Sequence, residues 1–216
     1  MTSDEADGTE LVRASYDAIF ERYAAWDDDA VDDVRQRAFE HALALVPSRR
    51  RALDLGCGTG TKITHRIASE FEHLTAVDVS PRSIAAARAT LPDAELLVAD
   101  MTTLELGASS LDLVTAFFSI IHVPAAEQPA LFRRIATWLA PGGILVCNLG
   151  TAPGDQHDDF LGAPMFWSSL APTESIAALA DAGLDVLHHE VDTRTEHGVA
   201  VSFLWITARR VQREVA

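Results

Sequence analysis

Apolar runs and amphipathic patterns alternate along the middle of this 216-residue chain, and this alternation constrains the fold more than any other feature. The apolar runs predict strands at residues 51–56, 74–79, 94–100, 111–118 and 142–150. The amphipathic patterns predict helices at residues 61–71, 80–91 and 125–139. Strands joined through helices by short connections form a parallel sheet that is covered on both faces. We therefore predict a single α/β domain over residues 1–216, built as a three-layer sandwich.

The last part of the chain has a different pattern. It predicts a helix at residues 173–183, followed by strands at residues 184–191 and 199–210. Thr173 is the expected N-cap of the helix, and Gly183 is its expected C-terminal stop. The segment between the two strands is too short for a crossover helix, so we predict an antiparallel hairpin.

Two further segments flank this core. Residues 1–46 predict an N-terminal helical cap, with helices at residues 9–25 and 30–46 and an acidic run, residues 27–33, between them. That run suits a solvated helix N-terminus better than a metal site. Residues 151–172 show no periodicity and predict a long loop, which we expect to act as a lid on the substrate side.

Composition excludes several classes of partner. The 17 basic residues are outnumbered by 32 acidic ones, giving a net charge of −15, which disfavours nucleic acids and anionic membrane surfaces. No apolar run is long enough to cross a membrane, and the acidic N-terminal residues are unlike a signal peptide. The chain has two cysteines, so no disulfide framework is expected. These features predict a cytoplasmic protein, and they leave its oligomeric state open.

The most informative motif follows the first predicted strand. In the segment RALDLGCGTGTKI, Gly56, Gly58 and Gly60 occupy every second position. A dinucleotide-binding loop has the spacing G-x-G-x-x-G, which would need a glycine where this chain has Thr61. Asp54, at the end of the strand, would repel a pyrophosphate and attract a cation.

Two more acidic residues end the next two predicted strands. Asp78 follows Gly56 by 22 residues, which suits a carboxylate that accepts hydrogen bonds from ribose hydroxyl groups. Asp100 could accept a hydrogen bond from an exocyclic amine such as that of adenine, and Met101 could pack against the base. A cofactor with a ribose, a purine and a positive charge fits these groups, and S-adenosylmethionine (SAM) is such a molecule.

Five segments of the chain resemble, in order, the motifs of the class I SAM-dependent methyltransferases. They are LDLGCGTG, AVDVS, VADM, FFSIIHVP and LAPGGILV. The resemblance extends over residues 16–209. It implies a Rossmann-like fold with a seven-stranded, mostly parallel sheet of order 3-2-1-4-5-7-6, in which strand 7 is antiparallel. It also implies SAM as the cofactor and S-adenosylhomocysteine (SAH) as its product.

The resemblance carries roles to individual positions. It implies that the cofactor is bound by Tyr23, Gly56, Cys57, Gly58, Asp78, Val79, Asp100, Met101 and Phe117. Among these, Gly56, Cys57 and Gly58 would line the methionine end, Asp78 would hold the ribose, and Phe117 would lie near the sulfonium. Tyr23 belongs to an apolar helix stripe, so core packing is an alternative role for it.

Methyl transfer places an acceptor in line with the sulfonium, and a base can assist it. His122 is the candidate base, because it follows the fourth predicted strand and titrates near neutrality. Amino-sugar N-methyltransferases resemble this arrangement and imply a role for Tyr16 beside it. The alternatives are a core histidine and a core tyrosine.

We expect the acceptor to be a small organic molecule, such as a secondary metabolite, that lies against Phe166 and Trp167 of the 151–172 segment. Trp167 could instead only anchor that segment. The methylated atom could be nitrogen, oxygen or carbon. A SAM-binding enzyme that does not transfer methyl, such as a cyclase, and an NAD-dependent reductase are the competing functions. His157 and its acidic neighbours match no strong ligand pattern, so no metal site is predicted.

Overall fold

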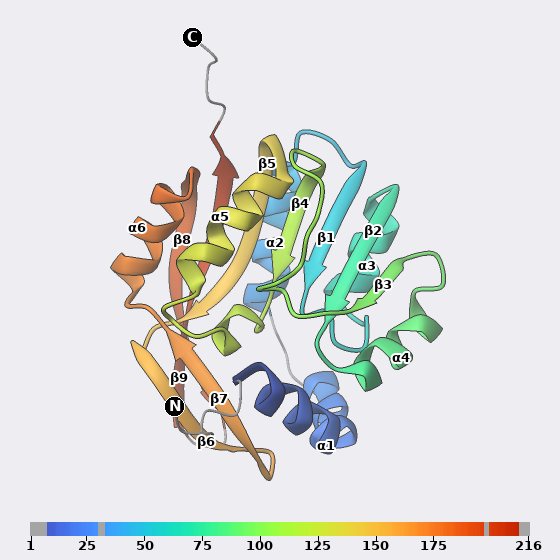
Figure 1. The fold of residues 1–216 in the computed structure, drawn as a ribbon, viewed down its shortest axis with the longest axis vertical. Coiled ribbons are helices and arrows are strands. Elements are labelled where there is room, and N and C mark those ends of the chain that lie inside the picture. Colours follow the sequence, from blue (N-terminus) through green and yellow to red (C-terminus); the bar gives the residue numbers. More distant parts are fainter. Residues whose placement is uncertain (1–7, 30–32, 197–198, 212–216) are drawn as a thin grey trace.

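The computed structural model describes residues 8–29, 33–196 and 199–211 (Figure 1). The helices are α1 (Gly8–Asp29), α2 (Asp33–Leu45), α3 (Ile63–Glu70), α4 (Pro81–Thr90), α5 (Gln128–Trp138), α6 (Pro172–Asp181) and a single 3-10 turn, η1 (Ile120–His122). The strands are β1 (Arg51–Leu55), β2 (His73–Asp78), β3 (Glu95–Val98), β4 (Leu111–Ala116), β5 (Leu139–Gly150), β6 (Gly154–Phe160), β7 (Ala163–Ser169), β8 (Leu184–Glu196) and β9 (Val199–Arg210). None of the helices in these ranges combines the length and the apolar character that crossing a bilayer would need.

The central sheet has seven strands in the order β3-β2-β1-β4-β5-β9-β8. Strands β1 to β5 pair in parallel, and β9 runs antiparallel to both β5 and β8. Because β6 and β7 form a separate sheet, β8 and β9 are the sixth and seventh strands of the central one. The predicted Rossmann-like architecture, with its antiparallel seventh strand, is confirmed.

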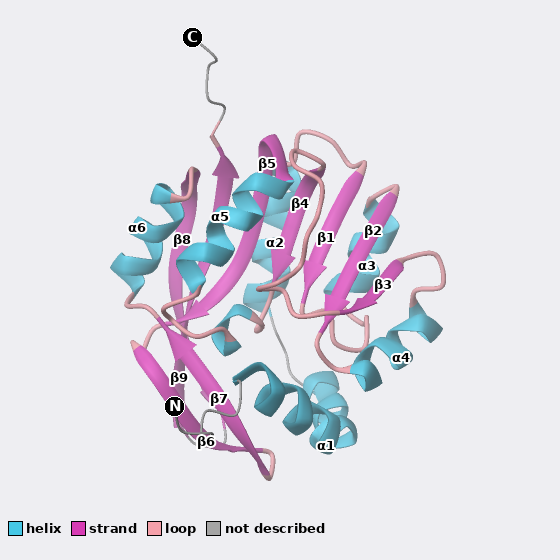
Figure 2. Cartoon of the chain, viewed as in Figure 1, coloured by secondary structure: helices cyan, strands magenta, loops and turns pink. Residues whose placement is uncertain are grey.

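Helices cover both faces of this sheet, as Figure 2 shows, with α5 and α6 in front of it and α2 and α3 behind. The strands supply one apolar cluster to each face, because successive side chains of a strand point in opposite directions. On β4, Val114 packs with α5 and α6, whereas Leu113 packs with α2, α3 and α4. Both side chains are fully buried.

The segment at residues 151–172, predicted to be a loop, is instead largely an antiparallel β hairpin. Strands β6 and β7 pair from Gly154 opposite Ser169 to Phe160 opposite Ala163. The two-residue turn between them has positive φ angles at Leu161 and Gly162, 55° and 82°, as a type I′ turn requires. The prediction was wrong because β6, with the sequence GDQHDDF, is almost entirely exposed and has no apolar face.

The start of the last helix also differs from the prediction. Pro172 is its first residue and Ala171 precedes it, so Thr173 is not the N-cap. Ala171 has no side-chain acceptor, and the Glu174 carboxylate instead accepts the Ala171 N–H at 3.1 Å. Gly183 ends the helix as predicted, with a φ of 85°.

The predicted hairpin of the last two strands is confirmed, but the strands are longer than expected. β8 runs to Glu196 and β9 begins at Val199, so most of the expected connection is strand, and residues 197–198 lie outside the described ranges.

The two N-terminal helices have different places in the fold. Helix α1 is longer than predicted and lies across the ends of the parallel strands, beside β7 and α4 (Figure 1). Helix α2 packs on the sheet against β5 and β9 and so belongs to one of the outer layers. Only α1 therefore covers the sheet edge. The acidic run at residues 27–33 includes residues 30–32, which lie outside the described ranges.

Candidate functional site

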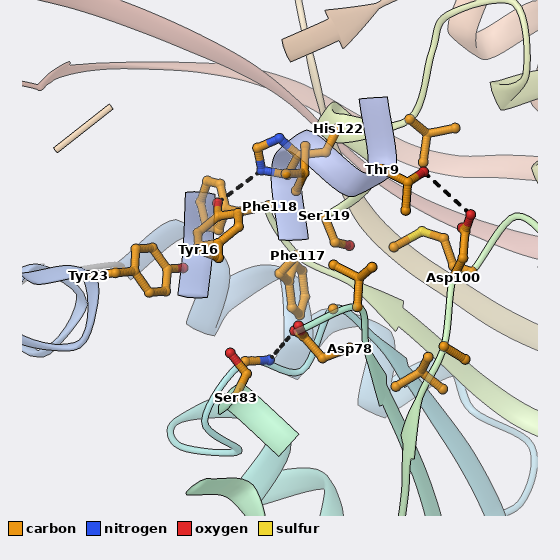
Figure 3. A pocket seen from close by; sticks show the side chains of 18 residues that line it. Thr9, Tyr16, Tyr23, Asp78, Ser83, Asp100, Phe117, Phe118, Ser119 and His122 are labelled. Atoms are coloured by element: carbon orange, nitrogen blue, oxygen red, sulfur yellow. Dashed lines mark hydrogen bonds between the residues drawn. The ribbon is translucent and has the colours of Figure 1, made fainter. Parts of the chain in front are cut away.

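A cavity lies where the parallel strands end, under helix α1 (Figure 3). It has about 750 Å³ of empty space, part of which is open to solvent. Its walls are the segments that follow β1, β2, β3 and β4, together with η1 and the inner face of α1. This first cavity occupies the carboxyl edge of an open α/β sheet, where such folds bind ligands.

The turn after β1 is built around Gly56. Its φ of 79° lies in the left-handed region, and a Cβ atom there would come within 2.4 Å of the Ser119 Cβ atom. The N–H groups of Gly56 and Cys57 both donate to the Val77 carbonyl oxygen, at 2.7 and 3.0 Å. A glycine is therefore required at position 56, because any side chain would collide with the segment after β4.

Asp78, at the end of β2, is half-buried and lines the first cavity. Its two oxygens accept the N–H groups of Gly58 and Ser80, each at 2.8 Å. Burial raises the pKa of the Asp78 carboxyl to about 6, because the charged form loses its water, and these two N–H groups oppose that rise. Each oxygen keeps a second lone pair for a ligand hydroxyl group.

Ser80 connects helix α1 to the start of α4, close to Asp78. The Ser80 hydroxyl accepts the Ser83 N–H at 3.0 Å, as the N-cap of α4, and donates to Asp17 on α1. The negative charge of Asp17 contributes to the raised pKa of Asp78. The first turn of α1 also contacts the segment after β3, because the Thr9 hydroxyl donates a hydrogen bond to Asp100 at 3.4 Å (Figure 3).

Eight of the nine predicted cofactor residues line this first cavity. They are Tyr23, Gly56, Gly58, Asp78, Val79, Asp100, Met101 and Phe117. The ninth, Cys57, lines a second cavity instead, where burial raises the pKa of its thiol and keeps it protonated. The structure thus brings these residues together, and their binding roles stay predictions.

The second cavity adjoins the first and shares Tyr23, Gly56, Gly58, Phe117 and Phe118 with it. Asp54 forms part of its wall and accepts the hydroxyl groups of Thr64 and Thr115 at 2.7 and 2.6 Å. Burial raises the pKa of the Asp54 carboxyl.

Two cations, Arg35 and Lys62, also line the second cavity, and the sequence had not indicated either of them. The Arg35 guanidinium lies 5.6 Å from the centroid of the Phe118 ring. Cations and a carboxylate at one end of a cavity are suited to a ligand that carries both charges, as an amino acid does.

Tyr16 and His122 meet in the first cavity. The Tyr16 hydroxyl lies 2.9 Å from His122 Nε2, and His122 Nδ1 lies 2.7 Å from the Phe166 carbonyl oxygen. A carbonyl can only accept, so Nδ1 carries the proton and Nε2 accepts the Tyr16 O–H. The expectation that His122 titrates near neutrality was wrong, because burial lowers its pKa to about 4 and keeps the imidazole neutral at pH 7.

Tyr16 and His122 belong to a closed circle of aromatic contacts, which we call the aromatic cycle. Its successive ring centroids are 5.1 Å apart for Tyr16 and Tyr23, 6.3 Å for Tyr23 and Phe160, and 5.4 Å for Phe160 and Trp167. Trp167 lies 4.7 Å from His122, and His122 lies 5.4 Å from Tyr16. The cycle joins α1 to the β6–β7 hairpin and to η1.

A third cavity lies on the far side of this cycle, between the hairpin and the start of β9. Phe160 and Trp167 line it, as do the carboxylates Asp158 and Asp159. No Lys or Arg stands among the described residues of its wall. A cavity of this composition favours an uncharged or cationic ligand with a flat or apolar surface.

The two predicted substrate residues point in opposite directions, because they are neighbours on a strand. Trp167 faces the third cavity, whereas Phe166 is buried against Gly8 of α1 and lines none of the three cavities. Its backbone carbonyl, not its ring, therefore reaches the site, through His122. The His157 ring lies 5.2 Å from the Phe166 ring, and no metal-binding group of three His, Cys, Asp or Glu occurs in the described ranges.

Comparison with known proteins identifies the kind of chain to which this one is similar. Residues 52–143 match the family described as "Methyltransferase domain". A dTDP-3-amino-3,4,6-trideoxy-alpha-D-glucopyranose N,N-dimethyltransferase from Streptomyces venezuelae is 32% identical over 142 residues, which cover 65% of this chain and 56% of the relative. A trans-aconitate 2-methyltransferase from Variovorax paradoxus is 34% identical over 136 residues, or 61% of this chain and 48% of the relative. The chain thus spans about half the length of these two relatives.

A solved structure extends the likeness to nearly the whole fold. It is the 1,6-didemethyltoxoflavin-N1-methyltransferase of Burkholderia thailandensis, with 1,6-didemethyltoxoflavin and S-adenosylhomocysteine bound. The TM-score is 0.74 at 16% identity, and the match covers 98% of this chain and 92% of that one. At this identity, the likeness concerns the fold alone.

Proposed function

We propose that this chain is a class I SAM-dependent methyltransferase that transfers a methyl group from SAM to a small organic molecule, and the match of residues 52–143 to a methyltransferase domain supports this proposal. The observation that carries the proposal is the pair of adjoining cavities that meet at Gly56 and Phe117. One offers the Asp78 carboxylate to a ribose, and the other offers cations and a carboxylate to an amino acid. SAM has these two ends, joined by a sulfonium.

In this proposal the adenosine occupies the first cavity. Asp78 accepts the ribose hydroxyl groups, and Asp100 accepts the adenine amine, with Val79 and Met101 packing on the base. The methionine end occupies the second cavity, where Arg35 pairs with its carboxylate. The sulfonium then lies where the cavities meet, beside Phe117.

The methyl group would extend toward Tyr16 and His122. Transfer is an in-line displacement, in which the acceptor atom bonds to the methyl carbon while the carbon–sulfur bond breaks and SAH leaves neutral. The Tyr16 oxygen orients the acceptor by accepting a hydrogen bond from the group that is to be methylated. As positive charge develops on the acceptor, the proton passes to Tyr16 and the Tyr16 proton passes to His122 Nε2.

The acceptor would enter through the third cavity and reach the methyl group across the aromatic cycle. Trp167 and Phe160 supply surface for stacking, while Asp158 and Asp159 disfavour anions. We therefore propose an uncharged or cationic acceptor, methylated on nitrogen, oxygen or carbon.

Calorimetric titration and methyl transfer test this function together. We expect SAM and SAH to bind and NAD to bind far more weakly, because Asp54 and Asp78 repel a pyrophosphate. Labelled SAM should then transfer its methyl group to uncharged or cationic members of a metabolite panel. Binding of NAD without SAM would support a reductase, and SAM binding without transfer to any acceptor would support a non-methylating enzyme.

The pKa of Asp78 predicts a specific pH dependence of cofactor binding. Because the ribose hydroxyl groups donate to the ionised carboxylate, a carboxyl with a pKa of about 6 must release its proton for SAH to bind. The affinity for SAH should therefore fall about tenfold between pH 7 and pH 5. Calorimetry at several pH values would measure it, and Asp78→Asn should bind more weakly with a flat profile. A wild-type affinity that is constant over this range would contradict the assignment.

We also infer a reducing cellular compartment, the cytoplasm, for this protein. Its two cysteines, Cys57 and Cys147, are free thiols buried in the fold. Burial raises the pKa of Cys147 to about 12, so the thiol is inert. The net charge of −15 supports a small-molecule partner over a nucleic acid.

A further inference from the structure

One buried hydroxyl group in the first cavity lacks a hydrogen-bond partner among the described residues. It belongs to Ser119, which follows Phe117 and Phe118 at the end of β4 and is only 6% exposed. Buried polar groups nearly always have a partner, because removal from water without one is unfavourable. A hydroxyl left in this state beside an open cavity indicates that a ligand supplies the missing contact.

The position of Ser119 separates it from the other unpartnered groups. Those groups, in the described part of the chain, belong to Gln128, Arg134, Asn148, Ser175 and Trp205. None of them lines any of the three cavities, whereas Ser119 lines the first. Ser175, fully buried on α6, is therefore a natural comparison for an unpartnered serine that faces no ligand.

Two contacts and the view in Figure 3 locate Ser119 within the cavity. Its Cβ atom is the neighbour that excludes a side chain at Gly56, where the first and second cavities meet. Its carbonyl oxygen accepts the His122 N–H at 3.1 Å, so both residues share one turn. Figure 3 shows Ser119 between the Tyr16–His122 pair and Asp100. Ser119 thus lies between the proposed place of the sulfonium and the proposed path of the methyl group.

We propose that Ser119 Oγ binds the positively charged sulfonium–methyl unit of the cofactor, an inference that rests on the proposed function. An oxygen lone pair that faces a cationic methyl group accepts C–H···O contacts from it. The positive charge on sulfur polarises these C–H bonds and strengthens the contact, as charge does for ordinary hydrogen bonds. No covalent change occurs at the serine.

This role has a consequence for the product. SAH has neither the methyl group nor the positive charge, so it leaves Ser119 Oγ without its partner. The contact stabilises SAM and contributes nothing to SAH. Ser119 would therefore raise the selectivity of the enzyme for its cofactor over its product and favour product release.

The test compares two dissociation constants in one variant. In Ser119→Ala the affinity for SAM should fall about fivefold, the size expected of one such contact, while that for SAH stays unchanged. Calorimetry on the full chain measures both. Ser175→Ala removes a comparable unpartnered hydroxyl and should change neither constant. Thermal unfolding of the empty Ser119→Ala protein should show no loss of stability, because no hydrogen bond is removed.

The outcomes separate the two proposals. An equal loss of affinity for SAM and SAH in Ser119→Ala would overturn the inference, since the hydroxyl would then bind a part that both share. No loss for either would overturn it too. Wild-type protein that binds neither compound would overturn the proposed function itself.

A second variant covers the case in which alanine disturbs the turn. Ser119→Cys keeps the size of the side chain and replaces the oxygen by a much weaker acceptor. With SAM labelled with carbon-13 at the methyl group, the bound methyl resonance of the wild type should lie downfield of that in Ser119→Cys. Identical methyl shifts in the two proteins would contradict the contact.

Discussion

Replacing Gly56 by alanine should lower the affinity for SAH by roughly a hundredfold, the size of effect expected when a binding group moves by about 1 Å. The new Cβ atom would lie 2.4 Å from the Ser119 Cβ atom, which is bonded directly to the backbone of the segment after β4 and is not the far end of a flexible side chain. The turn after β1 must therefore shift, and with it the N–H of Gly58 that holds Asp78. Calorimetry with SAH would measure the loss.

Gly142 provides a matched control for this variant. Its φ of 82° is close to the 79° of Gly56, but a Cβ atom there would meet nothing within 4 Å. Gly142→Ala thus introduces the same backbone strain without the collision, and it should leave SAH affinity unchanged at a cost of about 1 kcal/mol in the free energy of unfolding. Equal affinities in the two alanine variants would refute the argument.

Replacing His122 by asparagine should lower the turnover number by about a hundredfold and leave SAM affinity nearly unchanged. The asparagine amide can still donate to the Phe166 carbonyl oxygen, as Nδ1 does now. Asparagine has no hydrogen-bond acceptor at the position of Nε2, so the Tyr16 hydroxyl loses its partner. Steady-state kinetics with an identified acceptor, together with calorimetry for SAM, would separate the two effects.

Tyr16→Phe completes a double-mutant cycle with this variant. If the two side chains act as one proton-transferring pair, Tyr16→Phe should lower turnover by a similar factor. The double variant should then be little worse than either single one. Multiplicative losses would show that Tyr16 and His122 act independently, and unchanged turnover in His122→Asn would remove that residue from the mechanism.

Most of the fold could be predicted because strands β1 to β5 are apolar and are separated by amphipathic helical patterns. The hairpin at β6 and β7 could not, since β6 exposes His157, Asp158 and Asp159 to solvent and owes its conformation to pairing with the buried β7. Its turn, Leu161–Gly162, also lacks the Asn or Asp that usually marks a type I′ turn. Thr173 was misplaced as N-cap because Pro172 already takes the first helical position.

Some residues of the site could likewise be predicted from the sequence, and others could not. Asp78 and Asp100 were identifiable because parallel strands bring their carboxyl ends to one edge of the sheet, so position along the chain predicts position in space. Arg35, Phe160 and Ser119 were not, because their approach to the cavities depends on how α2, the hairpin and the turn after β4 pack. Phe166 and Trp167 were expected to act together, but adjacent residues of a strand face opposite ways.

Helix α1 both closes the first cavity and carries Tyr16. Its contacts with Asp100 and Ser80 hold it over the sheet edge, and the Tyr16–His122 hydrogen bond spans the same gap. Under the proposed function, a cofactor that passes under this helix would have to part the Tyr16–His122 hydrogen bond. Exchange of the cofactor and assembly of the proposed reactive pair would then be coupled through α1.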